Sequence, residues 1–232
     1  MADFDIAAPT SADAFARLAI ELHDAPGVEE TVDAVVQFAL QALNCMYAGL
    51  ALYTRGSRPE IAAVTDPVVS DVYGLQIDSG NGPLMVALRE RSTVLIRDTT
   101  HDDRWPVWAA KVAGLGVRSV LDVPLTTGDR ATVGVLGLYS ADPDAFGLDD
   151  EAIAQILARH ASVAVASARH EETMEQAVDA RKLVGQAMGI LMERFDLDGD
   201  RAFAILKRYS QDTNTKLRDV AQQLIDTRKL PH

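Results

Sequence analysis

The amino-acid sequence predicts an α+β fold, a β-sheet with helices on its faces, followed by an all-α module at the C-terminus. Three observations predict it. Helical and strand-like apolar patterns alternate over the first part of the chain. One long helical pattern then runs from about Asp149 to Phe195, where Gly185 and Gly189 are the only residues that disfavour a helix. Two shorter helical patterns follow.

The first part of the chain predicts ten elements. They are helices at 12–24 and 31–43, strands at 46–54 and 60–65, helices at 68–75 and 84–90, a strand at 93–97, a helix at 107–115, and strands at 118–124 and 132–139. The clearest helix start is at Asp66 and Pro67, because an N-cap carboxylate precedes a proline at the first helical position.

The long helical pattern carries a heptad-like seam, in which apolar and polar residues recur at a spacing of three or four. Its members are Ile153, Ile156, His160, Val163, Ser167, His170, Met174, Ala177, Arg181, Val184, Met188 and Leu191. Polar residues at seam positions weaken a coiled coil. The sequence therefore predicts a marginal two-stranded contact between two copies of the chain, able to shift when the first domain changes state.

The last fifty or so residues predict three helices joined by two tight connections. In the third helix, Leu217, Val220 and Leu224 belong to an almost ideal amphipathic stripe. Gly and Asp residues at 196–200 are expected to end the first helix and cap the second. The connection at 211–215 is expected to supply oxygen acceptors that cap the third helix.

Three ungapped segments of this region resemble the ANTAR family of RNA-binding transcription antiterminators. They are GQAMGILMERF (185–195), DRAFAILKRYSQDTN (200–214) and TKLRDVAQQLI (215–225). The resemblance implies a three-helix module at residues 171–228 that acts as a homodimer. It also implies binding to paired RNA hairpins in nascent transcripts, which favours an antiterminator structure over a terminator.

Basic and amide side chains of this module are the candidate RNA-binding residues. Cations pair with phosphates, and short polar side chains can contact the bases of a loop. The candidates are Arg181, Gln186, Arg194, Lys207, Arg208, Thr213, Asn214, Lys216 and Arg218. Two alternatives stay open: these residues form an ordinary solvated surface or helix caps, and the C-terminal helices serve only for dimerisation.

Two segments of the first part resemble a GAF domain, most closely the GAF domains joined to ANTAR modules in actinobacteria. They are GNGPLMVALRERSTVLIRDTTHDDRWP (80–106) and GVRSVLDVPLTTGDRATVGVLGLYSADPDAF (116–146). The resemblance covers residues 12–170 and implies a sensory domain with an antiparallel sheet, whose small-molecule signal is unknown. Candidate pocket residues are Leu50, Tyr73, Leu84, Trp105, Trp108, Val120 and Asp122.

Composition and motifs set limits on the function. The net charge is −12, of which −11 belongs to the first 170 residues and −1 to the rest, so the C-terminal module is nearly neutral and its cations are locally clustered. No membrane span, signal peptide or catalytic motif is visible, and we expect a cytoplasmic protein that is not an enzyme. The single cysteine, Cys45, lacks the partner that a redox enzyme needs. We expect no metal site at His101–Asp103 or in the Asp-rich turn at 196–200.

Overall fold

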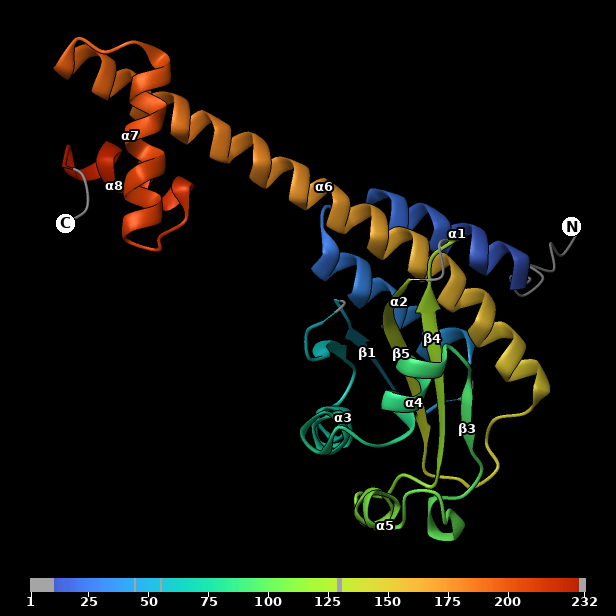
Figure 1. Cartoon of the computed structure of the whole chain (residues 1–232). Coiled ribbons are helices and arrows are strands. Elements are labelled where there is room, and N and C mark those ends of the chain that lie inside the picture. Colours follow the sequence, from blue (N-terminus) through green and yellow to red (C-terminus); the bar gives the residue numbers. More distant parts are fainter. Residues whose placement is uncertain (1–10, 44, 55, 129–130, 230–232) are drawn as a thin grey trace, which may run out of the picture. The chain divides into compact units, whose positions relative to one another are not determined.

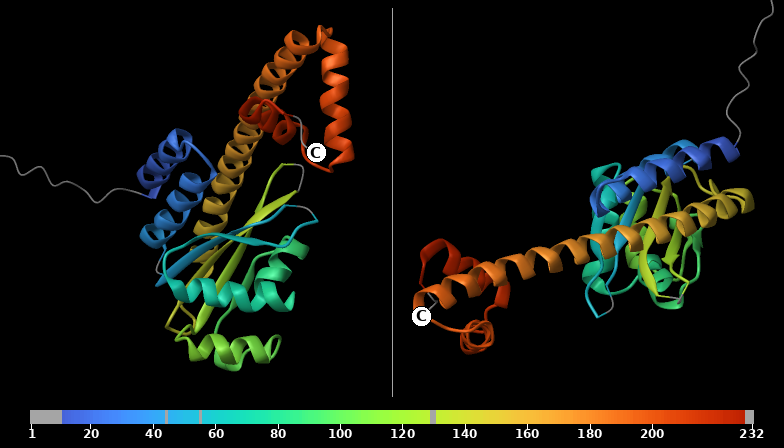
Figure 2. Two further views of the ribbon diagram at one scale, coloured as in Figure 1. Left: turned by 90° about the vertical axis from the view of Figure 1, so that its left-hand side faces the viewer. Right: turned by 90° about the horizontal axis from the view of Figure 1, so that it is seen from above.

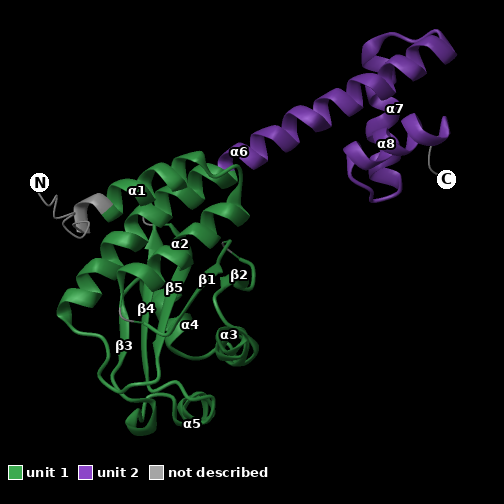
Figure 3. Ribbon diagram, turned by 180° about the vertical axis from the view of Figure 1, so that it is seen from behind, with its two compact units in different colours: residues 1–169 green, residues 170–232 purple. Residues whose placement is uncertain are grey.

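The computed structural model describes residues 11–43, 45–54, 56–128 and 131–229. The chain divides into two compact units, Met1–Arg169 and His170–His232, which Figure 3 shows in green and purple. The predicted domain limits, 12–170 and 171–228, differ from this division only near the termini and by one residue at the junction, and they stay a prediction.

The described elements follow the expected order. The first unit holds α1 (Ser11–Asp24), α2 (Val28–Ala42), β1 (Tyr47–Leu52), β2 (Glu60–Val64), α3 (Pro67–Ser79), α4 (Pro83–Glu90), β3 (Val94–Ile96), the 3-10 turn η1 (Thr99–His101), α5 (Pro106–Gly114), β4 (Ser119–Thr126) and β5 (Thr132–Ser140). The helix α6 (Leu148–Phe195) belongs to both units, and α7 (Gly199–Asp212) and α8 (Leu217–Thr227) complete the second. The long helix predicted from the sequence is thus confirmed.

Five strands form one sheet in the order β2-β1-β5-β4-β3, and every neighbouring pair is antiparallel. Figures 1 and 2 show α1 and α2 on one face of this sheet, together with the N-terminal part of α6, and α3, α4 and α5 on the other. The predicted α+β class, an antiparallel sheet with helices on its faces followed by a helical module, is confirmed.

Each face of the sheet has its own apolar core. On the first, Phe15 of α1 stacks at a tilt on Phe38 of α2, with ring centroids 5.2 Å apart, and Leu157 of α6 is fully buried. On the second, helices α3, α4 and α5 pack over the sheet around Tyr73 and Tyr139. Successive residues of a strand point to opposite faces of the sheet, so Leu50 and Ala51 of β1 belong to opposite cores.

Two glycines allow α3 to lie directly on the sheet. A Cβ at Gly49 would come within 3 Å of Val69 and Tyr73 of α3. A Cβ at Gly137 would come within 3 Å of three polar atoms, which belong to Tyr73, Tyr139 and Asp122. Gly49 and Gly137 pair across β1 and β5, so the missing side chains leave adjoining spaces into which Tyr73 fits.

Local signals set most helix ends. The carboxylate of Asp66 accepts a hydrogen bond from the Val68 amide at 2.9 Å and so caps α3, as predicted. This helix continues to Ser79, a turn beyond its predicted end, and buried Gln76 lies in the added turn. Gln76 accepts a hydrogen bond from the Leu84 amide at 2.7 Å, which joins α3 to the start of α4.

The second unit is a small helical bundle. Its core consists of Ala187, Leu191, Ala202, Leu206, Val220, Ala221 and Leu224, which come from α6, α7 and α8. The carboxylate of Asp198 accepts a hydrogen bond from the Arg201 amide at 2.8 Å and caps α7, as the sequence predicted for this connection. No described helix is long and apolar enough to cross a membrane.

Candidate nucleic-acid interface and sensor core

The candidate RNA-binding residues all lie at the surface of the second unit. In the connection between α7 and α8, Thr213 is half-buried and Asn214 is exposed. The other seven are exposed: Arg181, Gln186, Arg194, Lys207, Arg208, Lys216 and Arg218. They come from all three helices of the unit and from the connection between α7 and α8.

Intramolecular partners divide these cations into two groups. Arg208 lies 3.5 Å from the Asp212 carboxylate, and Arg218 lies 3.1 Å from that of Asp219. Arg194 donates to the Arg228 carbonyl oxygen at 2.6 Å, at the end of α8. These three side chains are therefore partly committed within the protein.

Three other cations have no such commitment. Within the described residues, the side chains of Arg181, Lys207 and Lys216 make no hydrogen bond or ion pair. An exposed ammonium or guanidinium group without a nearby carboxylate is available to an external anion, so these three are the least committed cations among the candidates.

The connection between α7 and α8 differs from the expectation that it caps α8. The α8 N-cap is Lys216, which makes no side-chain capping bond. Thr213 instead caps the end of α7, and its hydroxyl donates to the Tyr209 carbonyl at 2.7 Å. Asn214 adopts a left-handed conformation with φ of 51°, a conformation that asparagine tolerates well. The side-chain hydrogen bonds of this connection are made by Ser210, Thr213 and Thr215, and the Asn214 carboxamide makes none within the described residues.

One exposed residue of this unit was not among the candidates. Phe203 of α7 is 40% exposed and lies outside the bundle core. It precedes Lys207 by one helical turn, so the two side chains lie on one flank of α7. The sequence does contain a signal for Phe203: it is an aromatic residue that lies outside the apolar core positions of its helix and one turn before a lysine.

The candidate pocket residues of the first unit do not meet in one open cavity. Tyr73, Leu84, Val120 and Asp122 are fully buried in the core beneath α3, α4 and α5. The structure places Leu50 on the opposite face of the sheet, in the core beneath α1, α2 and α6.

The two tryptophans line a smaller cavity near the surface. Trp105 and Trp108 bound a volume of about 230 Å³ together with Asn81 and Lys111. The indole Nε1 of Trp108 is buried without a hydrogen-bond partner among the described residues. The Arg104 guanidinium lies 4.8 Å from the Trp105 ring centroid and closes one side.

Asp122 is the most unusual titratable group of the sensor core. Both of its carboxylate oxygens are buried without a hydrogen-bond partner among the described residues, and the Tyr139 hydroxyl is in the same state. Burial raises the pKa of Asp122 to about 8, because desolvation disfavours its charged form. The nearby Tyr73 hydroxyl donates to the Gly49 carbonyl at 2.8 Å. The core thus holds a neutral carboxyl group at neutral pH.

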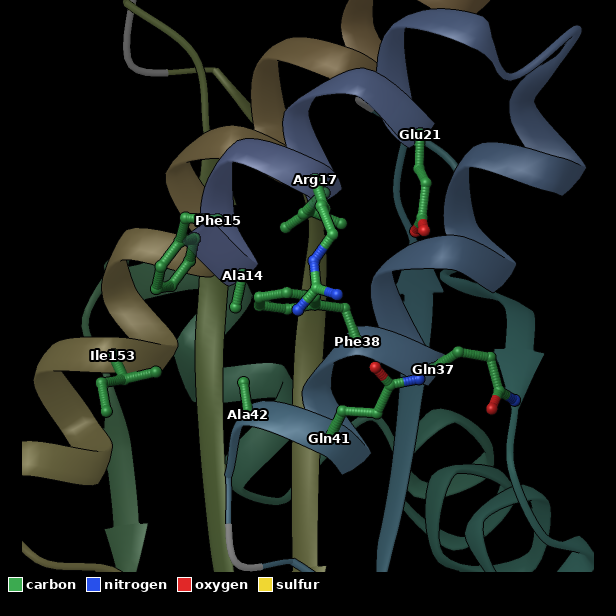
Figure 4. Close-up of a pocket in the computed structure, with 10 residues that line it drawn as sticks. Ala14, Phe15, Arg17, Glu21, Gln37, Phe38, Gln41, Ala42 and Ile153 are labelled. Atoms are coloured by element: carbon green, nitrogen blue, oxygen red, sulfur yellow. The ribbon is translucent and has the colours of Figure 1, made fainter. Parts of the chain in front are cut away.

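A second cavity lies on the other face of the sheet. It has a volume of about 440 Å³ and opens between α1 and α2, beside α6. Figure 4 shows Phe15, Phe38 and Ile153 at its apolar wall, with Arg17 and Glu21 on the α1 side. Its mixed lining suits a partly polar occupant.

Two sequence expectations concerned chemistry rather than binding. Within the described residues, His101 Nδ1 contacts the Asp98 carboxylate, Asp102 forms an ion pair with Arg104, and no cluster of three or more metal-ligating side chains occurs. Burial raises the pKa of the Cys45 thiol to about 11, so the thiol stays protonated and is a poor nucleophile.

Comparisons with known proteins agree with this architecture. The GAF domain family model matches residues 25–166, and the ANTAR domain family model matches residues 172–225. Comparison with curated proteins gives no match. Neither family match indicates a source organism, so the likeness to actinobacterial regulators stays a prediction.

Solved structures resemble the first unit. The GAF domain from Acinetobacter phosphoenolpyruvate-protein phosphotransferase is 16% identical, with a TM-score of 0.55, and the match covers 72% of this chain and 99% of that one. The GAF domain of the corresponding protein from Coxiella burnetii is 17% identical, with a TM-score of 0.55 and coverage of 70% and 96%. Free methionine-R-sulfoxide reductase from Neisseria meningitidis is 16% identical, with a TM-score of 0.54 and coverage of 69% and 90%. At such identities the likeness concerns the fold alone.

The GAF match covers more than half of the chain, and the ANTAR match covers the helical unit that carries the exposed cations. The chain therefore belongs to the GAF domain family and joins a GAF sensor domain to a C-terminal ANTAR domain, an RNA-binding antitermination domain.

Proposed function

We propose that the chain is a homodimeric antitermination regulator, in which the GAF domain controls how two ANTAR modules are presented to paired RNA hairpins in nascent transcripts. One observation carries the proposal. The bundle matched by the ANTAR family model exposes Arg181, Lys207 and Lys216 without a carboxylate partner among the described residues. Because nascent transcripts are made in the cytoplasm, the proposed function also places the protein there.

The proposed RNA surface comprises the nine candidate residues, which differ in weight. Lys207 and Lys216 contribute most to phosphate binding, because their charges are not neutralised within the protein. Asn214 offers a free carboxamide to a base edge. Arg208 and Arg218 contribute less, because a bound phosphate must compete with Asp212 and Asp219.

Dimerisation is proposed to use the seam on α6. In the first unit, Ile156 and Val163 of this seam are 46% and 69% exposed. In the second, Met174 is 55% exposed. Apolar side chains at seam spacing on an exposed helix face suit a second copy of the same helix. Pairing of two modules raises avidity for two linked hairpins without any new contact.

The GAF domain is proposed to receive a small-molecule signal and to act without catalysis. The cavities beside Trp105 and beside Phe15 are candidate entry points, and their linings do not define a ligand class. The protonated state of the Cys45 thiol argues against the cysteine chemistry of a redox enzyme. The alternative function is a sensing or protein-interaction domain whose C-terminal helices serve only for dimerisation, and the exposed Met174 favours it as much as it favours the proposal.

RNA binding by the full chain tests the proposal against this alternative. The probe is the tightest-binding RNA selected by the wild-type chain from a library of two tandem stem-loops with randomised loops. We expect binding that weakens with salt, and a double variant Lys207→Ala/Lys216→Ala whose salt slope is smaller by about 1.4 to 1.8, since each lost phosphate contact removes roughly 0.7 to 0.9.

The matched control removes the same charge from the GAF domain. Arg89→Ala/Arg97→Ala should leave the salt slope unchanged, because both exposed cations lie outside the ANTAR domain and line neither of the two candidate cavities. Failure to select any RNA, or equal slopes for the two double variants, would support the alternative function.

A further inference from the structure

The flank of α7 that carries Lys207 differs chemically from the rest of the ANTAR domain surface. Phe203 lies one turn before Lys207 and exposes 40% of its surface. It is not part of the apolar core of the helical bundle. Beyond the end of the helix, Asn214 and Lys216 are exposed and their side chains have no partner among the described residues. We call Phe203, Lys207, Asn214 and Lys216 the α7 flank surface.

These four residues offer three different kinds of contact. Phe203 is partly exposed, and an aromatic ring is a platform on which a nucleobase can stack. Two uncommitted ammonium groups suit phosphates. A free carboxamide donates to and accepts from the edge of a base. Double-stranded RNA buries the faces of its bases, so a stacking platform is useful only against an unpaired base.

We propose that Phe203 stacks on an unpaired loop base of the RNA hairpin, while Lys207 and Lys216 hold the flanking phosphates and Asn214 contacts a base edge. The proposal rests on the proposed RNA-binding function and names the part of the RNA that is recognised. It assigns a base-binding role to a residue that charge alone does not single out.

The local structure favours this arrangement. Helical spacing places Phe203 and Lys207 roughly 6 Å apart along one flank. Thr213 ends α7 and Asn214 turns the chain with a positive φ, so the side chains of Asn214 and Lys216 follow directly beyond the helix end. Arg208 is the next residue after Lys207, but it projects about 100° further around the helix and lies beside Asp212.

The first measurement compares two neighbouring cations. With the selected tandem stem-loop RNA described above, Lys207→Ala should lower the salt slope by about 0.7 to 0.9. Arg208→Ala is the matched control: it removes the same charge from the adjacent position and should change the slope by less than half as much, because Arg208 projects about 100° away around the helix and lies beside Asp212.

The second measurement isolates the ring of Phe203. Phe203→Leu keeps an apolar side chain and should weaken RNA binding by about 5- to 150-fold, the range that base–aromatic stacking gives. Phe203→Tyr keeps the ring and should restore most of the affinity. Thermal melting and sedimentation of each variant establish that the fold and the dimer are intact.

The third measurement identifies the base. Abasic nucleotides are introduced one at a time along each loop. At one loop position, the abasic RNA should bind the wild type and Phe203→Leu equally, because the stacking partner is already absent.

The outcomes separate the inference from the function beneath it. If Lys207→Ala weakens binding while Phe203→Leu and wild type bind every RNA equally, RNA binding stands and the stacking role is wrong. If Phe203→Leu dissociates the dimer instead, Phe203 belongs to an interface between copies and the inference is overturned. If the wild-type chain selects no RNA at all, the proposed function fails as well.

Discussion

Arg118 holds the carboxylate of Asp98 with two hydrogen bonds, from Nε to Oδ1 at 3.0 Å and from Nη2 to Oδ2 at 2.8 Å. Arg118 immediately precedes β4, and Asp98 follows β3. Asp98 also accepts from the Thr100 amide and contacts His101 Nδ1 at 2.9 Å. One carboxylate therefore joins the end of β3, the turn η1 and the start of β4.

Asp98→Asn should lower the melting temperature of the GAF domain at neutral pH. The Arg118 guanidinium, aided by His101, holds the pKa of Asp98 well below its ordinary range. The stability that this depressed pKa contributes is present above pH 4 and is lost as the pH falls toward the folded-state pKa. The difference in melting temperature between wild type and variant should therefore stay constant from pH 6 to about pH 4 and shrink from about pH 4 to about pH 2. A difference that does not shrink below pH 4 would contradict the role assigned to this pair.

Asp122 should have the opposite pH dependence. Its folded-state pKa of about 8 lies above that of the unfolded chain, so the folded state holds a proton that the unfolded state has lost. Wild-type stability should fall as pH rises from about 4 to about 8, with a slope on the order of 1.4 kcal/mol per pH unit. Chemical denaturation at several pH values measures this slope.

Asp122→Asn should flatten that profile, because the amide does not titrate. Asp71→Asn, at an exposed position of α3, removes one carboxylate without touching the core and serves as the control. A profile for Asp122→Asn as steep as that of the wild type would mean that another group causes the slope.

The fold could be predicted further from sequence than the site could. The sequence predicted α6 almost to the residue, because a spacing of three or four runs over many turns and only Gly185 and Gly189 disfavour a helix there. It ended α3 a turn early, because Gln76 is polar yet buried, and its bond to the Leu84 amide is a tertiary contact that no local pattern shows.

The candidate pocket shows where the sequence falls short. Leu50 and Ala51 are neighbours on β1 and face opposite cores, and nothing in a short apolar strand indicates which residue faces which side. The same limit applies to the RNA surface. The sequence shows which residues are basic, but only the folded structure shows that Arg208 lies beside the Asp212 carboxylate while Lys207 has no partner among the described residues.

Gly185 and Gly189 give a prediction about α6 itself. Both are exposed within the helix, and a Cβ at either position would meet nothing within 4 Å among the described residues. Gly→Ala at each position should therefore stabilise the ANTAR domain by about 0.5 to 1 kcal/mol, because alanine loses less backbone entropy in a helix. Urea denaturation followed by circular dichroism measures the change, and a loss of stability would refute the open surroundings of these glycines.

If two copies of α6 pair along the proposed seam, a cysteine introduced at a seam position should form an intersubunit disulfide, and a cysteine on another face of α6 should not. Met174 is a seam residue, 55% exposed, and Gln176 is exposed on a different side of the same helix turn. In a parallel pair of helices a seam position meets its own copy, within the Cα separation of roughly 4.4 to 6.8 Å that a disulfide spans. In a Cys45→Ser background, Met174→Cys should form an intersubunit disulfide under mild oxidation, and Gln176→Cys should not. Equal cross-linking at both positions would indicate random collision, and cross-linking at Gln176→Cys alone would place the contact on another face of α6.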